Sequence, residues 1–538
     1  MNRFLKISVA NLQTLLERAR GRLPRDFHPH DYLEVNPDVA MAGHSAVRHY
    51  LKHGRAEGRE YKLGRHTLKQ LKALDPNKKN ILFVSHEASR TGAPIVCLKL
   101  IQALNKKYNI ICLLLGPGDL EEDFENSVNK LYRNNQNNPG LCLRTVKEIV
   151  ETDDIYCAVV NSVVSIYALE AICGHRIPTL SLIHEFTTYV KPHSFMEAVI
   201  RSSSEIVYSA EIIKADAVRY VPRWRPNERA HIIPQGRCIL DGNPEKDKVD
   251  AAFQPNGWPN ETKVIIGAGS FNFRKGVEFF LQTCSYILKM ANDKNLRFVW
   301  FGNGYDPEND FEFSLYFKEQ IVRSGLEQHI QIVGNIGSLE YAYNRATAFL
   351  LTSRLDPLPN VGLDAICHGL PIFCFADASG VADVLEREGL ADLLVSPHLE
   401  SYDMAQKVVK MLEDSEQRER VSGRLREIGR RQFSMERYAR DVDNLIDRAV
   451  ATNNIDKELA SKIAANDLVD MKFWNRQPEI RDVPKPNNQD VVAWQYVREV
   501  RSGVDRRKLR EGVDIFKIAG RDGISVDEAL NRFSGGKF

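Results

Sequence analysis

The stretch from residue 349 to residue 385 constrains the fold of this chain more than any other. It opens with the apolar run FLL, which is typical of a buried strand. The polar loop 353–360 follows, and its two prolines exclude a regular helix. A helical segment then starts at Gly362 and stops near Gly369, before a second apolar run, PIFCFAD. The pattern predicts a strand, a loop, a helix and another strand in succession.

Two acidic residues lie in this stretch, eight positions apart: Asp356 on the loop and Asp364 in the first turns of the helix. Backbone N–H groups around Val361 and Gly362 should face whatever lies in front of the helix, and such a terminus favours an anionic ligand. Acidic residues also gather at helix N-termini because of the helix dipole alone. For an isolated pair of acids, that alternative stays open.

The flanking residues carry more information than the pair. The run S-R-x-D-P-x-P-x-V-x-L-D-A, followed by G-L-P-I, resembles the acidic-x7-acidic motif of family 4 retaining glycosyltransferases. The resemblance implies an α/β protein with a GT-B fold, in which two Rossmann-like domains face each other across a cleft. It places Asp356 beside the donor sugar and Asp364 on the ribose of the nucleotide, although the family usually has Glu at both places. Arg354, Val361 and Gly362 become donor-binding candidates.

A second element lies upstream, in the strand–loop–helix stretch that begins KVIIGAGSFNFRKG. This stretch resembles the family's G-R-x4-K-G element at Gly267, Gly269, Arg274, Lys275 and Gly276, without the Arg that usually lies next to the first glycine. Two cations in a loop before a helix can neutralise a diphosphate, and a solvent-exposed basic pair is the alternative. Gly302 follows the next apolar strand, at the sheet edge where the nucleotide is expected.

The amino-terminal half has a β-α-β opening at Asn80, which predicts a parallel sheet. Gly92, in its first loop, lets a backbone approach a ligand closely, and the resemblance places this loop at the donor phosphates and the acceptor. His184 and Glu185 end a later strand, where open α/β sheets bind ligands. By resemblance His184 contacts the donor sugar.

Composition excludes several other classes. A formal net charge of +2 gives no reason to expect nucleic acid as a partner. The nine cysteines are scattered, with no C-x-x-C or zinc spacing, which suits buried thiols in a reducing compartment. No apolar window is long enough to span a bilayer and no secretory signal is visible. We therefore expect a cytoplasmic protein, with neither a bound metal nor a cofactor.

At 538 residues the chain should hold two or three domains. Residues 1–26 contain six Arg or Lys against two acids, beside apolar residues that can share a helix face. Such a helix suits an anionic membrane surface, or it packs on its own domain. Residues 27–61 resemble a module found beside bacterial polysaccharide-synthesis glycosyltransferases, and their histidines have no zinc spacing. The predicted units are a helical extension and module (1–78, with a helical linker from 62), the acceptor domain (79–240), an interdomain linker (241–260), the donor domain (261–432), a crossover helix (433–453) and an appendage (454–538).

The resulting prediction is a retaining glycosyltransferase that does not use a metal ion. It would move a sugar from a nucleotide-diphosphate sugar to a glycan or lipid-linked glycan acceptor in cell-surface polysaccharide synthesis, peripheral to the inner face of the membrane. His184, Asp356, Arg274 and Lys275 are the catalytic candidates. Two rivals remain open: a GT-B nucleotide-sugar epimerase or phosphorylase, and a non-catalytic carbohydrate-binding or scaffold protein that kept the fold.

Overall fold

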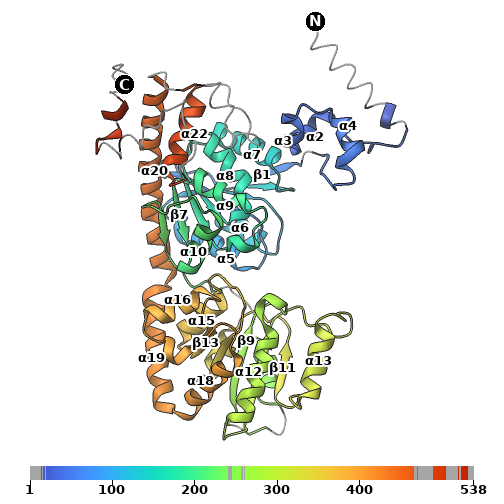
Figure 1. The fold of residues 1–538 in the computed structure, drawn as a ribbon, viewed down its shortest axis with the longest axis vertical. Helices are drawn as coiled ribbons and strands as arrows, with labels where there is room; N and C mark the ends of the chain where they lie inside the picture. The colour runs from blue at the N-terminus through green and yellow to red at the C-terminus, as the bar shows by residue number, and fades with distance from the viewer. Residues whose placement is uncertain are drawn as a thin grey trace.

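The structure is a computed structural model built around two separate β-sheets (Figure 1). It describes residues 14, 16–18, 20–62, 64–239, 245–255, 258–259, 261–465, 469–470, 489–504, 519, 523–526 and 528–530. The predicted α/β architecture, with two Rossmann-like domains, is confirmed.

The first sheet has eight strands in the order β1-β4-β3-β2-β5-β6-β7-β8. All neighbouring pairs are parallel except β1 with β4. The central strands read as continuous apolar runs because helices cover both faces of a parallel sheet. The strands are β1 (His66–Gln70), β2 (Asn80–Ser85), β3 (Asn109–Leu114), β4 (Lys130–Asn134), β5 (Ile155–Asn161), β6 (Thr179–Ile183), β7 (Glu205–Tyr208) and β8 (Ala230–Ile232).

Six α-helices and two short 3₁₀ helices connect these strands. Buried side chains from the two faces of the sheet form two core clusters, one on each side. The helices are α5 (Gly92–Leu104), α6 (Glu121–Ser127), α7 (Pro139–Thr152), η2 (Val163–Ser165), α8 (Ile166–Gly174), η3 (Thr187–Tyr189), α9 (Ser194–Ser202) and α10 (Glu211–Tyr220).

The second sheet is wholly parallel, with six strands in the order β11-β10-β9-β12-β13-β14. Its strands are β9 (Lys263–Ala268), β10 (Leu296–Phe301), β11 (Ile330–Val333), β12 (Ala348–Leu351), β13 (Ile372–Phe375) and β14 (Val395–Ser396). Its helices are α11 (Lys246–Phe253), η4 (Phe273–Lys275), α12 (Val277–Met290), α13 (Ser314–Arg323), α14 (Glu340–Arg345), α15 (Asn360–His368), α16 (Gly380–Arg387), α17 (Ala391–Leu394), α18 (Ser401–Glu413) and α19 (Ser415–Gln432).

A 31-residue helix, α20 (Met435–Ala465), returns from the second domain and runs along the first (Figure 1). It contacts α5, β5, β6 and β7, and it packs against α22 (Gln489–Arg501). At this contact the fully buried carboxylate of Asp456 forms ion pairs with Arg229, Arg498 and Arg501. One carboxylate therefore ties both C-terminal helices to the first domain.

A small helical module precedes the first sheet and comprises α2 (Pro29–Val35), α3 (Pro37–Met41), α4 (Ala46–His49) and the π-helical turn η1 (Tyr50–Gly54). It has its own small aromatic core, in which Phe27, Tyr32 and Tyr50 are in ring contact. Ion pairing of Arg144 on α7 with Glu34 joins it to the first domain. Of the predicted basic helix in residues 1–26, all but residues 14, 16–18 and 20–26 lie outside the described residues.

Two local predictions need correction. The segment 62–78 was expected to be a helical linker, but His66–Gln70 is a strand that pairs with Lys130–Asn134 at the edge of the first sheet. The interdomain linker was placed at 241–260, yet α11 lies inside that range and buries Val249, Ala252 and Phe253 in the core of the second domain. Edge pairing and core packing decided both cases, because tertiary contacts override local polarity.

Asp441 and Asp443 lie two positions apart on α20 and have different partners. Asp441 pairs with Arg437 on the same helix, and Asp443 pairs with Lys107 of the first domain. In the part of the chain that the structure describes, no helix is long and apolar enough to span a bilayer.

Candidate active site

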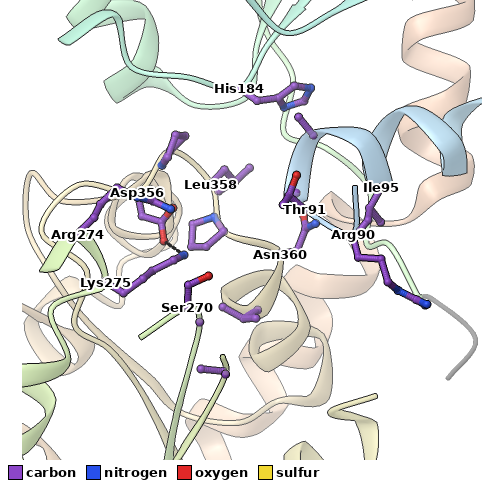
Figure 2. A pocket seen from close by; sticks show the side chains of 18 of the residues that line it. Arg90, Thr91, Ile95, His184, Ser270, Arg274, Lys275, Asp356, Leu358 and Asn360 are labelled. Atoms are coloured by element: carbon purple, nitrogen blue, oxygen red, sulfur yellow. Dashed lines mark hydrogen bonds and ion pairs between the residues drawn. The ribbon is translucent and has the colours of Figure 1, made fainter. Parts of the chain in front are cut away.

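A cleft of about 650 Å³ lies between the two domains, and both contribute to its walls. The first domain supplies residues of the loops after β2 and β6, and the second supplies residues of the loops after β9, β10 and β12. Figure 2 shows His184 entering from the first domain, opposite Arg274, Lys275 and Asp356 of the second. Its lining includes Gly92, His184, Glu185, Tyr189, Gln235, Gly269, Arg274, Lys275, Gly302, Asp356, Asn360 and Val361.

The topology explains why these residues meet. In a parallel sheet all strands present their carboxyl ends at one edge, so loops distant in sequence gather there. His184 directly follows β6, Gly302 follows β10, and Asp356 lies five residues beyond β12. Of the eleven predicted site residues, the cleft brings together eight: Gly92, His184, Gly269, Arg274, Lys275, Gly302, Asp356 and Val361.

Asp356 lies between the two predicted cations. Arg274 Nη1 donates to its Oδ1 at 2.9 Å, and Lys275 Nζ lies 2.5 Å from its Oδ2. The Ser353 hydroxyl also donates to Oδ2, at 3.1 Å. Burial by itself would raise the pKa of Asp356, but the charges of Lys275 and Arg274 hold that pKa below its ordinary value. The site therefore keeps an ionised carboxylate and two cations in direct contact.

Glycines let the backbone approach this group closely. Gly302 has a φ of +149°, and a side chain there would collide with the carbonyl of Gly269. Gly269 has a φ of +144°, and the aliphatic part of the Lys275 side chain passes 3.1 Å from the position that its Cβ would take. The absence of a side chain at Gly269 thus leaves the space that Lys275 crosses to reach Asp356, and the absence of one at Gly302 lets the Gly269 backbone pack against it.

His184 is held by Asn161, a buried residue at the end of β5. Asn161 Nδ2 donates to the Ala93 carbonyl at 3.0 Å, so its Oδ1 is the atom that faces His184 Nε2, also at 3.0 Å. His184 must then donate from Nε2, which leaves Nδ1 as an acceptor. Burial lowers the pKa of His184, and the neutral imidazole is therefore favoured at pH 7.

Glu185, the residue that the sequence predicts together with His184 at this strand end, accepts hydrogen bonds from backbone N–H groups. Its Oε2 accepts the N–H groups of Val163 at 3.3 Å and of His184 at 3.2 Å. These bonds connect the loop after β6 to the end of β5. Glu185 therefore stabilises the loop that carries His184. Glu185 also lines the cleft.

The two domains approach each other at the N-terminus of α5. Asn360, at the start of α15, accepts from Gln235 Nε2 at 3.1 Å, and Gln235 also donates to the Leu358 carbonyl at 2.9 Å. Asn360 Nδ2 lies 3.9 Å from the position of a Cβ on Gly92. Gln235 thus holds the loop between Asp356 and α15 against the end of the first domain.

Two predicted donor-binding residues, Arg354 and Gly362, have other contacts. Arg354 stacks 3.6 Å from the ring centroid of Phe273, forms an ion pair with Glu278 and donates to the Phe273 carbonyl. Gly362 is buried against Val381, which a Cβ would approach to 2.9 Å. Neither belongs to the described lining of the cleft.

Asp364 also lies outside that lining, one helical turn beyond Val361. Arg237 Nε donates to Asp364 Oδ1 at 2.9 Å, and the same guanidinium forms an ion pair with Glu340. His368 Nε2 lies 3.0 Å from Glu340 Oε2. Burial raises the pKa of Asp364 to about 6, although the positive charge of Arg237 opposes this shift.

Sequence patterns did not point to Asn161, Ser353, Arg237 or Asn360. Asn161 and His184 are 23 positions apart, and Arg237 and Asp364 are 127 apart. Only the meeting of strand ends and of domains produces such contacts. Across the described residues, no group of three or more His, Cys, Asp or Glu side chains is arranged to hold a metal ion.

Curated relatives match parts of the chain. An uncharacterized glycosyltransferase of Haemophilus influenzae is 26% identical over 128 residues, which are 24% of this chain and 34% of that protein. Spore coat protein SA of Bacillus subtilis is 23% identical over 250 residues, 45% of this chain and 58% of the relative. The chain therefore matches from about a third to somewhat over half of these proteins' length.

Solved structures match more of the chain. HepE of Anabaena, in complex with UDP and glucose, superposes with a TM-score of 0.56 at 14% identity, covering 69% of this chain and 100% of HepE. A glycosyltransferase of Rickettsia africae superposes with the same TM-score at 17% identity, covering 70% of this chain and 99% of that one. At such identities the likeness establishes the fold.

The family match falls on the second domain, which carries Arg274, Lys275, Asp356 and Asp364. Residues 248–427 fit the family described as "Glycosyl transferases group 1". This match shows a group 1 glycosyl transferase domain over residues 248–427, and the two sheets with their cleft have the GT-B fold.

Proposed function

We propose that this protein transfers a sugar, with retention of anomeric configuration, from a nucleotide-diphosphate sugar to a glycan or lipid-linked glycan acceptor. The observation that carries the proposal is the contact of Arg274 and Lys275 with Asp356 in the interdomain cleft. Two cations beside one carboxylate suit a substrate that has a negative diphosphate and a reaction centre that becomes positive.

The cations would bind the diphosphate of the donor. Negative charge grows on the leaving phosphate oxygen as the bond to the anomeric carbon breaks, and preorganised cations stabilise that charge. Lys275 has only 12% of its side chain exposed, so little water screens it. Arg274 offers a planar guanidinium that can hold two phosphate oxygens at once.

Asp356 and His184 would hold the sugar from opposite domains. The Asp356 carboxylate can accept a sugar hydroxyl and stabilise the positive charge that develops at the anomeric carbon. His184 Nδ1, left as an acceptor by the bond to Asn161, can take a second hydroxyl. Both contacts position the anomeric carbon between the diphosphate and the first domain, where an acceptor can approach.

Retention follows if the acceptor hydroxyl attacks from the face that the phosphate leaves. The new C–O bond forms as the C1–O bond to the diphosphate breaks, and the hydroxyl proton passes to the departing phosphate oxygen. Double displacement would need a second carboxylate placed for attack on C1. We favour the single front-face step because the leaving phosphate can itself accept the proton.

UDP-sugars are the first donors to test, because HepE was solved with UDP and glucose. The experiment combines a thermal-shift screen of UDP-, GDP-, ADP- and dTDP-sugars with an assay of nucleoside diphosphate release. A ligand at about 100 times its Kd stabilises the fold by about 2.7 kcal/mol. Slow donor hydrolysis that disappears in Lys275→Ala supports the proposal. Binding without any turnover identifies a carbohydrate-binding scaffold instead.

The cellular role is part of the same proposal. The module at 27–61 resembles one found beside polysaccharide-synthesis enzymes, and the basic residues before it suit an anionic lipid surface. We therefore propose cell-surface polysaccharide synthesis at the inner face of the membrane. Flotation with liposomes that contain anionic lipid, comparing the full chain with a version lacking residues 1–26, tests the docking. Equal flotation of the two proteins would show that residues 1–26 do not anchor the protein to the membrane.

A further inference from the structure

Arg237 connects the two domains at the edge of the cleft. It lies just beyond β8, after Gln235 and Gly236, and its backbone N–H donates to the Phe433 carbonyl at 2.7 Å. Its guanidinium reaches into the second domain, where it binds Asp364 on α15 and Glu340 on α14. The side chain is 19% exposed, so these contacts are largely shielded from solvent.

The two carboxylates stand next to the cleft wall. Glu340 directly follows Leu339, and Asp364 lies one helical turn after Val361; Leu339 and Val361 both line the cleft. Tyr343 donates from its hydroxyl to the Val361 carbonyl at 3.2 Å, which connects α14 to the start of α15. The guanidinium of Arg237 therefore contacts α14 and α15 next to the part of the cleft wall where these two helices meet.

The charged and titratable neighbours of Asp364 lie on α14, on α15 itself and on the segment just after β8. Burial disfavours its ionised form, Arg237 and His368 favour it, and the charge of Glu340 opposes it. The remaining titratable neighbours are Tyr343, Cys367 and Cys238, whose pKa values burial raises, so they stay neutral at pH 7. Arg237 is the closest cation, because Nε lies 2.9 Å from Oδ1.

A ribose offers two neighbouring hydroxyl groups as donors. An ionised carboxylate has two acceptor oxygens for them, whereas a protonated carboxyl group turns one oxygen into a donor. The ribose contact that the family resemblance implies for Asp364, which we include in the proposed function, thus requires that its carboxyl group stay ionised. Charge-assisted hydrogen bonds are also roughly twice as strong as neutral ones.

We infer that Arg237 is a positioning residue of the donor site, whose guanidinium keeps the Asp364 carboxylate ionised and fixed beside Leu339 and Val361 so that it can accept the ribose hydroxyls. This inference rests on the proposed function. The inference also accounts for Asp364 at a position where the family usually has the longer Glu. The hydrogen bond from Arg237 fixes the position of the shorter side chain's carboxylate.

A purely structural role for Arg237 is the competing explanation. In that case its loss would lower thermal stability and leave the pH dependence of nucleotide binding unchanged. The two roles therefore separate in a pH profile. UDP itself gains a proton on its terminal phosphate near pH 6, so the profile needs a reference that lacks the Asp364 carboxylate.

The test measures UDP affinity by isothermal titration from pH 5 to pH 8.5, with GDP, ADP and dTDP as parallel probes. The proteins are the wild type, Arg237→Gln, Arg237→Lys and Asp364→Asn. Arg420→Gln is the charge-matched control, because Arg420 lies on α19 with 65% of its side chain exposed. Thermal unfolding of each variant reports its folding separately.

In the wild type, UDP affinity should fall as the pH drops through about 6. This fall should be larger than the one measured for Asp364→Asn. Arg237→Gln should move the midpoint of this fall upward by about one pH unit, since an opposite charge within hydrogen-bond distance shifts a pKa by about 1–3 units. Arg237→Lys should restore part of the shift, and Arg420→Gln should match the wild type.

Parallel profiles of the wild type and Arg237→Gln, both folded, would overturn the inference while the proposed function stands. A wild-type profile that matches Asp364→Asn would overturn it as well. A wild type that binds none of the four nucleotides would remove the proposed function, and this inference with it.

Discussion

Lys275 and Asp356, from two different loops of the second domain, form an ion pair with Nζ 2.5 Å from Oδ2 at the wall of the interdomain cleft. Arg274 completes the group on the other carboxylate oxygen. The three side chains have a net charge of +1, so a diphosphate finds an electropositive site that already contains the acid proposed for the sugar. In the proposed function, donor binding and chemistry would therefore be coupled at the Asp356 carboxylate.

Removal of either cation should slow the reaction without unfolding the protein. We expect Lys275→Ala and Arg274→Ala each to lower turnover by about 10²-fold or more, on the scale of losing one preorganised charge-stabilising donor. Steady-state release of nucleoside diphosphate measures the effect. Lys263→Ala is the matched control. Lys263 is the first residue of β9, the strand that precedes the loop with Arg274 and Lys275, and it pairs with Asp293. Wild-type kinetics in a folded double variant would contradict the diphosphate assignment.

The two acids of the D-x7-D motif should fail differently. The ribose does not change in the reaction, so Asp364→Asn should raise KM and leave kcat nearly intact. In the proposed reaction positive charge develops near Asp356, so Asp356→Asn should keep nucleotide affinity while transfer drops by orders of magnitude. Isothermal titration and steady-state kinetics test both. The reverse pattern would exchange the two assignments.

The imidazole of His184 should be needed in its neutral form. Burial lowers its pKa, and Asn161 presents an uncharged acceptor to Nε2. Asn161→Asp would place a negative charge there, which raises the pKa of His184. The acid limb of kcat/KM should then move to higher pH. Asn126→Asp, on the exposed side of α6, serves as the control, and an acid limb that stays in place would show that His184 need not be neutral.

Activity should persist in EDTA. In the proposed reaction Arg274 and Lys275 supply the positive charge that a divalent cation would otherwise bring to the diphosphate. Turnover is measured before and after chelation and dialysis. Complete loss that Mn²⁺ or Mg²⁺ restores would refute this account of leaving-group stabilisation.

Asp456 should be among the residues on which stability depends most. It is fully buried and faces Arg229, Arg498 and Arg501, so Asp456→Asn leaves three guanidinium groups without their anion. Breaking a buried ion pair costs about 3–5 kcal/mol. Thermal unfolding measures the change. Asp441→Asn, on the same helix with an i,i+4 partner, should cost about 0.5 kcal/mol. Equal stability of the two variants would disprove the role.

Local patterns and the family resemblance together predicted the fold class and eight residues that line the cleft. Apolar runs, glycine positions and the order of strands and helices predicted a parallel α/β sheet, and the resemblance implied two Rossmann-like domains, which the structure confirms. The local patterns fail for residues 66–70, where the sequence predicts a helix and the structure has an exposed, polar edge strand. An edge strand contributes little hydrophobic periodicity, and its pairing partners lie 60 to 68 residues away.

By itself the sequence determined where most strands end. It thus predicted that Gly92 and His184 would lie at the carboxyl edge of the first sheet, and Lys275, Gly302 and Asp356 at that of the second. Such information is local, because burial on both faces and turn chemistry act over a few residues. Only the tertiary structure decided that Asn161 orients His184, that Arg237 binds Asp364 across 127 positions, and that Asp456 holds three arginines. Those contacts depend on how two sheets and a returning helix pack, and no spacing in the chain specifies that geometry.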